Sequence, residues 1–391
     1  MKHFWLILAF VLLSLGLVGC AAAPTTTGRL IVWHTWDEAE APVIEQLLTD
    51  FQSLNPDIQI SVERKEYNMA LDEFAEASRA GLGPDMLIGL ESPHAHLLYD
   101  YGLVANLNEM NIDWTVFNPA TLQSVQSGDD ARVGVPLNAY VSVMYFNRSV
   151  IEEPPTTLEA LQAVSAEGIK VGLPTTFFAG YWGITGVGGS VFDGDALADD
   201  SAVNIAKWLE WLAAFQQTPG AVLSPDIRAL VDSFAKGDID LLMMDSLELA
   251  ALEEQLGSDQ LGVALIPGSP NSQPFSNVEL IVVNSASVQQ EAAARLSNFL
   301  CNETQQRKLA RSTSGRAPVN RVVNLNATLF PRVSMILQQN QTAVVPTTRQ
   351  DNLINRLIVT ADPIYQQVLE GLTTPMAGAQ FIVDTVNQEG R

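Results

Sequence analysis

Two neighbouring side chains near the start of the chain combine an aromatic ring with a carboxylate, which suits the binding of polyhydroxylated solutes such as sugars. Trp36 and Asp37 follow the short apolar run Leu30–Trp33. A flat ring stacks on the C–H face of such a solute, while a carboxylate accepts hydrogen bonds from its hydroxyls. Each residue also has a structural alternative, because Trp36 could pack under the following helix and Asp37 could cap that helix.

Further carboxylates and rings follow other apolar runs. Glu91 comes directly after Met86–Leu90, where Ser92 could instead cap the next helix, and Asp245 comes directly after Ile239–Met244. The densest aromatic cluster lies in a glycine-flanked segment and contains Phe177, Phe178, Tyr181 and Trp182. We expect rings from this cluster, with Phe178, Tyr181 and Trp182 as candidates, to stack on a solute, although the cluster could also be a local hydrophobic core.

The sequence contains no recognisable catalytic or metal-binding motif. Neither the G-x-S-x-G nucleophile elbow nor the G-x-x-x-x-G-K-[ST] phosphate loop occurs, and Gly183–Gly189 is interpreted as a flexible loop. His94 and His96 would point in different directions on a helix, so we expect no metal site and no cofactor. The many Asp and Glu residues leave open a pair of carboxylates that hydrolyse a glycosidic bond.

The composition excludes several other classes of protein. The chain has 391 residues, 47% of them hydrophobic, which is enough for about two domains with buried cores. Its formal net charge is -23, and no run of Lys or Arg interrupts the acidic balance, so a nucleic-acid partner is not expected. Two cysteines cannot form a disulfide framework, and Cys301, in an apolar helical stretch, is expected to be a buried hydrophobe.

The segments between the candidate residues predict alternating strands and helices. Strands are predicted at Leu30–Trp33, Ile58–Val62 and Met86–Leu90, separated by helices that begin near Val43 and at Met69. This β-α-β-α-β order predicts an α/β fold with a parallel sheet and helices on both faces, whose ligand site lies at the carboxyl ends of the strands. The same pattern continues later in the chain. It predicts strands at Ile169–Leu173, Ile239–Met244, Leu261–Ile266 and Val278–Val283, and helices at Ala202–Phe215, Asp226–Ala235, Ala292–Leu300, Glu303–Arg311 and Met376–Asn387.

The first residues have the pattern of a secretion signal. Lys2 precedes the apolar run Phe4–Val18, which is short for a membrane-spanning helix, and Cys20 follows it directly. The sequence Leu-Val-Gly-Cys ending at Cys20 resembles the bacterial lipobox, in which the Cys is lipidated. We therefore expect a signal peptide at 1–19 and a lipidated Cys20 with a flexible tether at 20–27. Cleavage would remove one positive charge, that of Lys2, and change the net charge from -23 to -24.

Several motifs in order along the chain resemble the extracellular solute-binding proteins of family 1, the sugar receptors of ABC importers that include the maltose-binding protein group. The motifs are Leu30–Trp36 (LIVWHTW), Gly81–Met86 (GLGPDM), Val135–Asn138 (VPLN), Val143–Arg148 (VMYFNR), Pro154–Leu161 (PPTTLEAL) and Phe234–Ile239 (FAKGDI). Leu158 stands where the family usually has Trp, and Leu241-Leu242 replaces small residues.

The resemblance implies a two-lobed periplasmic-binding-protein type II fold with a hinge. Each lobe is a sheet flanked by helices, and the chain crosses between the lobes about three times. It implies an N-terminal lobe of 28–138 and 279–328 and a C-terminal lobe of 142–275 and 332–391. Asn138 and Tyr140 would lie at the first crossing and Asn277 at the second, all able to face the cleft. Closure of the lobes would bury the solute.

The expected function is that of a substrate-binding lipoprotein of an ABC importer, with no catalytic residues. It would bind a carbohydrate or related polyol and deliver it to the transmembrane permease subunits. It would act as a monomer, anchored by lipid to the outer face of the cytoplasmic membrane on its periplasmic or extracellular side. Two alternatives remain. One is a surface-anchored glycoside hydrolase or other envelope enzyme, and the other is a receptor for a peptide, a polyamine or a metal chelate, for which acidic cleft residues would leave room.

Overall fold

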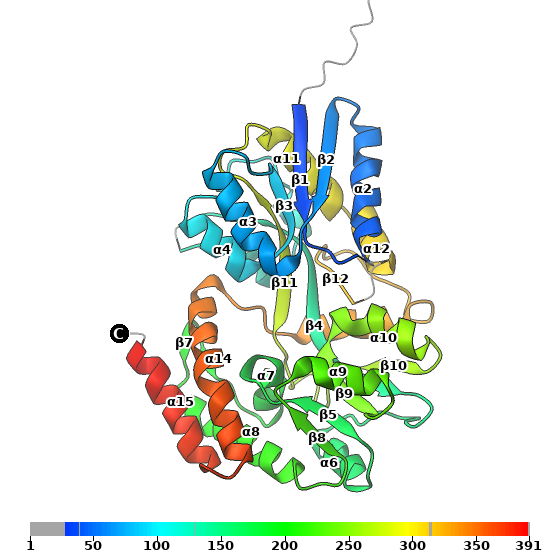
Figure 1. The fold of residues 1–391 in the computed structure, drawn as a ribbon, viewed down its shortest axis with the longest axis vertical. Helices are drawn as coiled ribbons and strands as arrows, with labels where there is room; N and C mark the ends of the chain where they lie inside the picture. The colour runs from blue at the N-terminus through cyan, green and yellow to red at the C-terminus, as the bar shows by residue number, and fades with distance from the viewer. Residues whose placement is uncertain (1–27, 39, 129, 313–314, 390–391) are drawn as a thin grey trace, which may run out of the picture.

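The computed structural model describes residues 28–38, 40–128, 130–312 and 315–389 as two lobes stacked along the long axis of the molecule (Figure 1). The predicted signal peptide (1–19), tether (20–27) and lipidated Cys20 lie outside the described residues. Within the described ranges, no helix is long and apolar enough to cross a membrane.

The N-lobe begins with the parallel β-α-β-α-β unit that the apolar runs predict. Strand β1 (Gly28–His34) pairs in parallel with β2 (Ile58–Arg64) on one side and with β3 (Met86–Glu91) on the other. Helices α2 (Ala41–Leu54) and α3 (Tyr67–Arg79) connect these strands. Apolar residues at helical spacing, including Ile44, Leu47, Leu48 and Phe51 of α2, are buried against the sheet.

Two long strands continue from one lobe into the other. β4 (Val135–Asn147) pairs with β11 (Ser276–Val283) in an antiparallel manner at its N-lobe end and with β9 (Leu241–Asp245) and β10 (Leu261–Ala264) at its C-lobe end. The strand order is therefore β2-β1-β3-β11-β4-β9-β5-β8, with β5 (Val171–Pro174) and β8 (Ala221–Ser224) at the far edge. This continuous sheet fixes the position of the side chains at the boundary between the lobes.

The hydrophobic core divides at the same boundary. One cluster contains residues from Leu30 to Ala139 and from Val278 to Val319, and we call this part the N-lobe. Two further clusters lie on opposite faces of the C-lobe sheet, because alternate residues of each strand point to opposite sides. In β9, Leu241 and Met243 belong to one cluster and Leu242 and Met244 to the other. The exact lobe bounds given above remain a prediction.

The remaining helices cover the two parts of the sheet. In the N-lobe they are α4 (Ser92–Asp100), η2 (Trp114–Val116), α5 (Pro119–Gln123), α11 (Gln290–Cys301) and α12 (Glu303–Ser312). In the C-lobe they are α6 (Leu158–Ala166), α7 (Phe177–Gly186), α8 (Ser201–Phe215), α9 (Ile227–Ala235), η3 (Ser246–Glu248) and α10 (Leu249–Leu256), with a small hairpin of β6 (Phe192–Asp193) and β7 (Ala196–Leu197). Cys301 is 2% exposed, as predicted for a buried hydrophobe.

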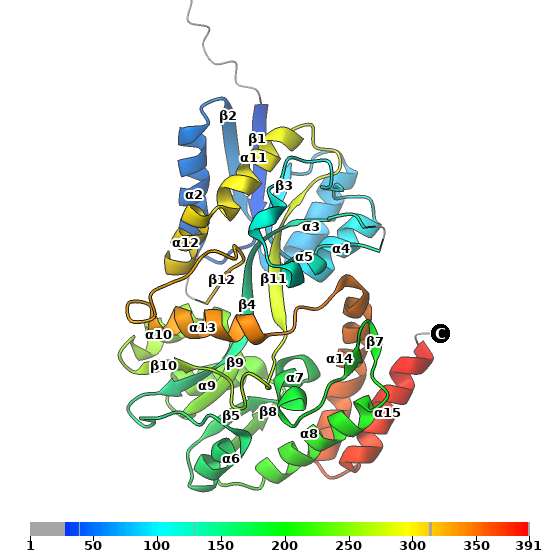
Figure 2. The same cartoon turned by 180° about the vertical axis from the view of Figure 1, so that it is seen from behind.

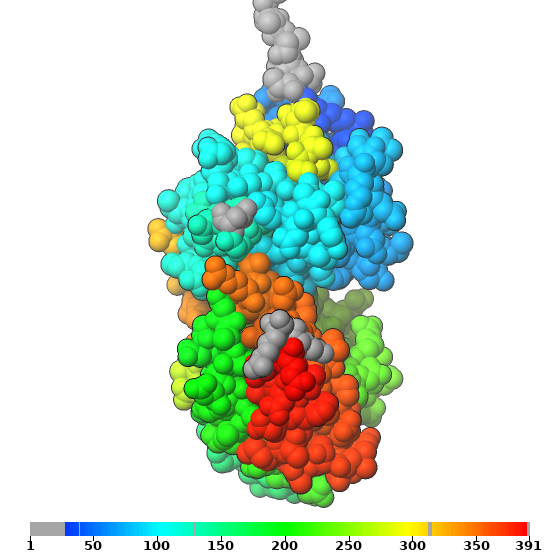
Figure 3. All heavy atoms as spheres, turned by 90° about the vertical axis from the view of Figure 1, so that its left-hand side faces the viewer, coloured from blue at the N-terminus to red at the C-terminus, as the bar shows by residue number. Residues whose placement is uncertain are grey.

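The chain returns to the C-lobe after β12 (Ala317–Pro318), which pairs with β4. Helix α13 (Pro331–Thr342) lies across the back of the molecule beside β4 (Figure 2). Helix α14 (Thr348–Leu369) then begins at the boundary between the lobes and runs into the C-lobe, where it packs with α15 (Pro375–Glu389) (Figure 3). The apolar face of α14 completes the C-lobe core with residues such as Leu357 and Tyr365.

The glycine-rich segment contradicts one prediction. Gly183–Gly189 is not a flexible loop throughout, because α7 continues to Gly186. The physical reason is close helix packing: a Cβ on Gly183 would lie 2.3 Å from a ring carbon of Trp208 on α8. The glycine therefore serves contact between two helices, which outweighs its poor helix propensity.

Candidate functional site

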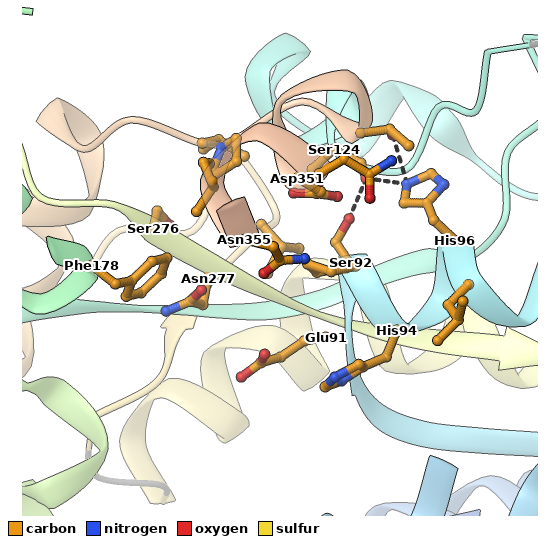
Figure 4. A pocket seen from close by; sticks show the side chains of 18 of the residues that line it. Glu91, Ser92, His94, His96, Ser124, Phe178, Ser276, Asn277, Asp351 and Asn355 are labelled. Carbon is orange, nitrogen blue, oxygen red and sulfur yellow. Dashed lines mark hydrogen bonds between the residues drawn. The ribbon is translucent and has the colours of Figure 1, made fainter. Parts of the chain in front are cut away.

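A cavity of about 590 Å³ opens at the boundary between the lobes. Its wall comes from the carboxyl ends of β3 and β9, the middle of β4, the start of β11 and the first turns of α4 and α14. Figure 4 shows side chains from these separate elements around one space. The site is thus at the strand ends, as expected for an α/β fold.

Glu91 and Asp245 bring carboxylates to this cavity from opposite lobes. Tyr140 lies between them, and its hydroxyl donates a hydrogen bond to Glu91. Asp245 accepts a hydrogen bond of 3.0 Å from the hydroxyl of Ser142. Burial raises the pKa of Asp245 to about 6, and the negative charge of Glu91 adds to this effect. Burial, followed by the charges of Glu91 and Asp245, also raises the pKa of Tyr140.

An aromatic ring, that of Phe178, and an amide, that of Asn277, also line the cavity. Phe178 on α7 lines the cavity and stacks on Phe275, with ring centres 5.0 Å apart and an angle of 26° between the planes. Asn277 on β11 also lines the cavity and lies beside Phe178 (Figure 4). The wall therefore offers the ring face and the planar polar groups that suit a saccharide.

The first turns of α14 supply polar residues that the sequence patterns did not indicate. Asp351, Asn352 and Asn355 line the cavity. The helix starts with a reciprocal capping box between Thr347 and Gln350, which fixes where these side chains lie. Burial raises the pKa of Asp351 to about 7. The Thr-x-x-Gln pattern before an apolar periodic segment was the signal that could have located this helix.

Thr348 connects the two lobes beside the cavity. Its hydroxyl donates to the carbonyl of Gln126 at 2.5 Å and lies 2.8 Å from Nε2 of His96. His96 Nε2 is also 2.8 Å from the carbonyl of Ser124, so this nitrogen is the donor in both contacts. Burial lowers the pKa of His96, which favours the neutral ring. The start of α14 is thereby held against the N-lobe.

Trp36 and Asp37 do not line the cavity. The indole of Trp36 is 1% exposed, packs close to Gly89, and has the guanidinium carbon of Arg316 4.7 Å from its ring centre. Asp37 accepts a hydrogen bond of 2.9 Å from the backbone N–H of Glu40 at the start of α2. Trp36 is therefore part of the packed interior, and Asp37 bonds the backbone of Glu40, the residue that precedes the first turn of α2.

Arg316 forms a buried ion-pair cluster with Glu279 and Glu40. Its guanidinium forms a double contact with Glu279, at 3.0 and 3.2 Å, and pairs with Glu40 on its other side. Burial alone would lower the pKa of Arg316, but the charges of Glu279 and then Glu40 outweigh it and raise the pKa. The cluster joins the start of α2, β11 and β12 close to the crossing strands.

Three other candidate residues are buried away from the cavity wall. Asn138 is 2% exposed on β4. Tyr181 stacks on Phe275 at 4.0 Å between ring centres and borders a separate hollow. Trp182 packs edge-to-face on Trp208. Most of the aromatic cluster is thus hydrophobic core, because α7 turns one side toward the C-lobe interior, and Phe178 alone of the cluster lines the cavity in the described structure.

No group of three or more His, Cys, Asp or Glu side chains among the described residues is arranged to hold a metal ion. His94 lies 3.4 Å from the hydroxyl of Tyr67, and His96 is engaged with Ser124 and Thr348.

Two α/β lobes joined by crossing strands, with a solute-sized cavity between them, define a periplasmic-binding protein of type II fold. The family model of the bacterial extracellular solute-binding proteins matches residues 46–331. The chain therefore belongs to this family, which acts outside the cytoplasm.

Two curated relatives match parts of the chain. The maltodextrin-binding protein MdxE of Bacillus subtilis (strain 168) is 23% identical over 335 residues, which cover 78% of this chain and 77% of that protein. The maltotriose-binding protein of Pyrococcus abyssi (strain GE5 / Orsay) is 26% identical over 141 residues, covering 35% of this chain. This second match spans only 30% of that relative's length.

Solved structures support the fold. The GacH receptor of Streptomyces glaucescens GLA.O, determined unliganded and in complex with acarbose, superposes with a TM-score of 0.79 at 16% sequence identity. The superposition covers 92% of this chain and 98% of the receptor. At this identity the likeness concerns the backbone fold.

Proposed function

We propose that the protein is the substrate-binding component of an ABC importer, which binds a carbohydrate or related polyol between its lobes and delivers it to the permease. The observation that carries the proposal is the cavity itself. Its wall combines a stacked ring, Phe178, with the amide of Asn277 and carboxylates from both lobes, Glu91 and Asp245. The named sugar ligands of the relatives point to the same class of solute.

In this mechanism the solute contacts both lobes at once. A sugar that binds Glu91 on the N-lobe and Asp245 or α14 on the C-lobe favours the conformation in which those surfaces approach each other. The permease then distinguishes the loaded protein by its closed shape. No bond in the solute breaks, so we propose binding without turnover.

The proposed location is the outer face of the cytoplasmic membrane, where the lipid on Cys20 holds a monomer near its permease. Labelling cells with a palmitate analogue tests the anchor. Wild type should incorporate the label and partition with membranes, whereas Cys20→Ala should do neither. Label in the Cys20→Ala variant would contradict the assigned lipidation site.

A panel of saccharides tests the solute class by thermal shift followed by calorimetry. Maltose, maltotriose, maltotetraose and other neutral oligosaccharides should include members that raise the melting temperature and bind at one site. A parallel assay with chromogenic glycosides should show no hydrolysis. Response to peptides or polyamines but to no saccharide would reject the proposal, and turnover of a glycoside would favour a hydrolase.

A further inference from the structure

The cavity wall carries acidic side chains without a matching basic side chain. Glu91, Asp100, Asp245 and Asp351 line it, and no lysine or arginine does so in the part of the chain that the structure describes. His96 also lines the wall, but burial lowers its pKa and thereby favours the neutral ring. The cavity therefore presents an acidic surface to whatever enters it.

None of these four carboxylates has a cationic partner among the described residues. Glu91, Asp100, Asp245 and Asp351 take part in none of the ion pairs. The buried carboxylates Glu40 and Glu279 differ, because they share Arg316. The acidic residues of the cavity are thus uncompensated, whereas those of the protein interior are paired.

Asp351 gives the independent indication that a ligand supplies the missing partner. One of its carboxylate oxygens, Oδ2, is shielded from solvent yet has no hydrogen-bond partner in the described structure. The side chain belongs to the cavity wall (Figure 4). A shielded carboxylate oxygen without a donor is costly, and a donor arriving in the cavity would relieve this cost.

The charge of the ligand's donor group determines how strongly it stabilises the shielded carboxylate oxygen. When the lobes close on a neutral sugar, water leaves the carboxylates and neutral hydroxyls replace it. An ammonium group instead forms charge-assisted hydrogen bonds, which are shorter and about twice as strong, and it offsets the mutual repulsion of Glu91 and Asp245. The acidic wall therefore favours a cationic solute over a neutral one of the same shape.

We propose that the preferred solute is a saccharide that carries a protonated amino group, held by Glu91 and Asp245 from opposite lobes and by Asp351 on α14. This inference rests on the proposed function as a saccharide receptor. The hydroxyls and C–H faces of the sugar meet Asn277 and Phe178, while the ammonium group meets the carboxylates.

Two matched pairs of probes test the inference by calorimetry. The first pair is maltotriose and its analogue with an amine in place of each primary hydroxyl. The second is triacetylchitotriose and chitotriose. Both pairs are titrated at a pH near 7, because the raised pKa values of Asp245, about 6, and Asp351, about 7, leave these carboxyl groups largely protonated at lower pH. The amine member of at least one pair should bind about tenfold more tightly than its neutral partner. This preference should decrease as NaCl is raised from about 50 to 500 mM.

Substitutions locate the preference in the cavity. Asp351→Asn should weaken binding of the amino sugar about tenfold and change binding of the neutral partner less than about twofold, because only the ion pair is lost. Glu91→Gln is the second variant, with the same expected pattern. Asp259→Asn, an exposed residue away from the cavity, is the matched control and should bind like wild type.

The outcomes separate this inference from the proposed function. A neutral sugar that binds as tightly as its amine partner in both pairs overturns the inference and leaves the saccharide receptor intact. An amine preference that survives both Asp351→Asn and Glu91→Gln overturns the assignment of these residues. Failure of every saccharide, neutral or amino, to bind would reject the proposed function as well.

Discussion

Arg316 sits between two carboxylates, Glu279 and Glu40, in a region that water scarcely reaches. Arg316 is 6% exposed, Glu40 7% and Glu279 4%. Removing one partner from such a cluster leaves like charges buried without compensation, which costs more than the pair itself contributes. The indole of Trp36 covers the guanidinium, so the ring stabilises the cation beside it.

Arg316→Met should therefore destabilise the protein strongly. The apolar side chain fills a similar volume but leaves Glu40 and Glu279 unpaired, for a loss of about 3–5 kcal/mol in the free energy of unfolding. Urea denaturation at pH 7 measures this loss. The control is Arg228→Met, whose i,i+4 pair with Asp232 is largely exposed, with an expected change of no more than about 0.5 kcal/mol. Equal effects of the two substitutions would contradict the assigned role of the buried cluster.

Asp351 should make the ligand-free protein less stable as the pH rises. Its pKa is raised by burial from 3.8 to about 7, so the folded protein holds the proton more tightly than the unfolded chain. Stability from this residue is present below pH 4 and is lost as the pH rises from 4 to 7. Asp351→Asn should thus raise the free energy of unfolding at pH 8 by about 1 kcal/mol and hardly change it at pH 4.

Urea denaturation of wild type and Asp351→Asn at both pH values measures this difference, with Asp259→Asn as the exposed control. A variant that is equally or less stable than wild type at pH 8 would show that the carboxylate is not penalised by burial.

Among the elements, α7 illustrates how a glycine can favour a helix through its neighbours. Trp208 of α8 lies over Gly183, and it also contacts Trp182 and stacks on Trp211. The helix in turn directs Phe178 toward the cavity and Tyr181 toward Phe275. The packing of α7 on α8 thus buries Trp182 against Trp208, while Phe178 lines the cavity.

Gly183→Ala should destabilise the protein by about 1–3 kcal/mol, because the new Cβ would lie 2.3 Å from the Trp208 ring. Gly180→Ala, in the same helix, is the matched control. Its Cβ would meet Trp208 at 3.4 Å, so the helix propensity of alanine should make this change neutral or stabilising, by up to about 1 kcal/mol. Thermal unfolding distinguishes the two, and a stabilising Gly183→Ala would refute the packing explanation.

Elements defined by local patterns could be predicted from the sequence. The strands β1, β3 and β9 are short, nearly continuous apolar runs, and each follows or precedes a clear turn. Helix α14 was missed because its first turn is polar and Pro363 lies within it. Candidate residues at strand ends, such as Glu91 and Asp245, could also be located, since topology places strand ends at the site.

The side-chain direction of the aromatic residues could not be predicted in the same way. Trp36, Trp182 and Phe178 are all aromatic residues that follow a predicted strand. The two tryptophans are nevertheless buried, because they pack on Gly89 and Trp208, which are distant in sequence. Such contacts form only when each lobe folds and brings distant segments of the chain together. Sequence patterns therefore locate the loops of the site better than the individual rings.

At the scale of the whole molecule, helix α14 links the N-lobe, the cavity and the C-lobe core. It begins against α4 of the N-lobe, passes Asp351 and Asn355 along the cavity, and ends in the C-lobe core. A solute that binds in the cavity and draws the lobes together therefore also favours the contact that Thr348 makes between α14 and the N-lobe. Binding and lobe contact should be energetically linked.

Thr348→Val should weaken saccharide binding about fivefold, because the hydroxyl contacts with Gln126 and His96, worth about 1 kcal/mol, would no longer favour the conformation in which the two lobes touch. Small-angle scattering should show a smaller decrease in radius of gyration at a given saccharide concentration. Thr342→Val is the control, since that hydroxyl bonds within α13 of the C-lobe. An unchanged affinity in Thr348→Val would separate lobe contact from binding.

Calorimetric titration of saccharides into the wild-type protein and into Phe178→Ala tests the central claim most directly. The cavity between the lobes predicts one site per chain for a saccharide from the neutral or amino panels. It also predicts about tenfold weaker binding in Phe178→Ala, since the stacking face is lost. No binding of any saccharide, or equal binding by wild type and Phe178→Ala, would contradict a saccharide site in this cavity.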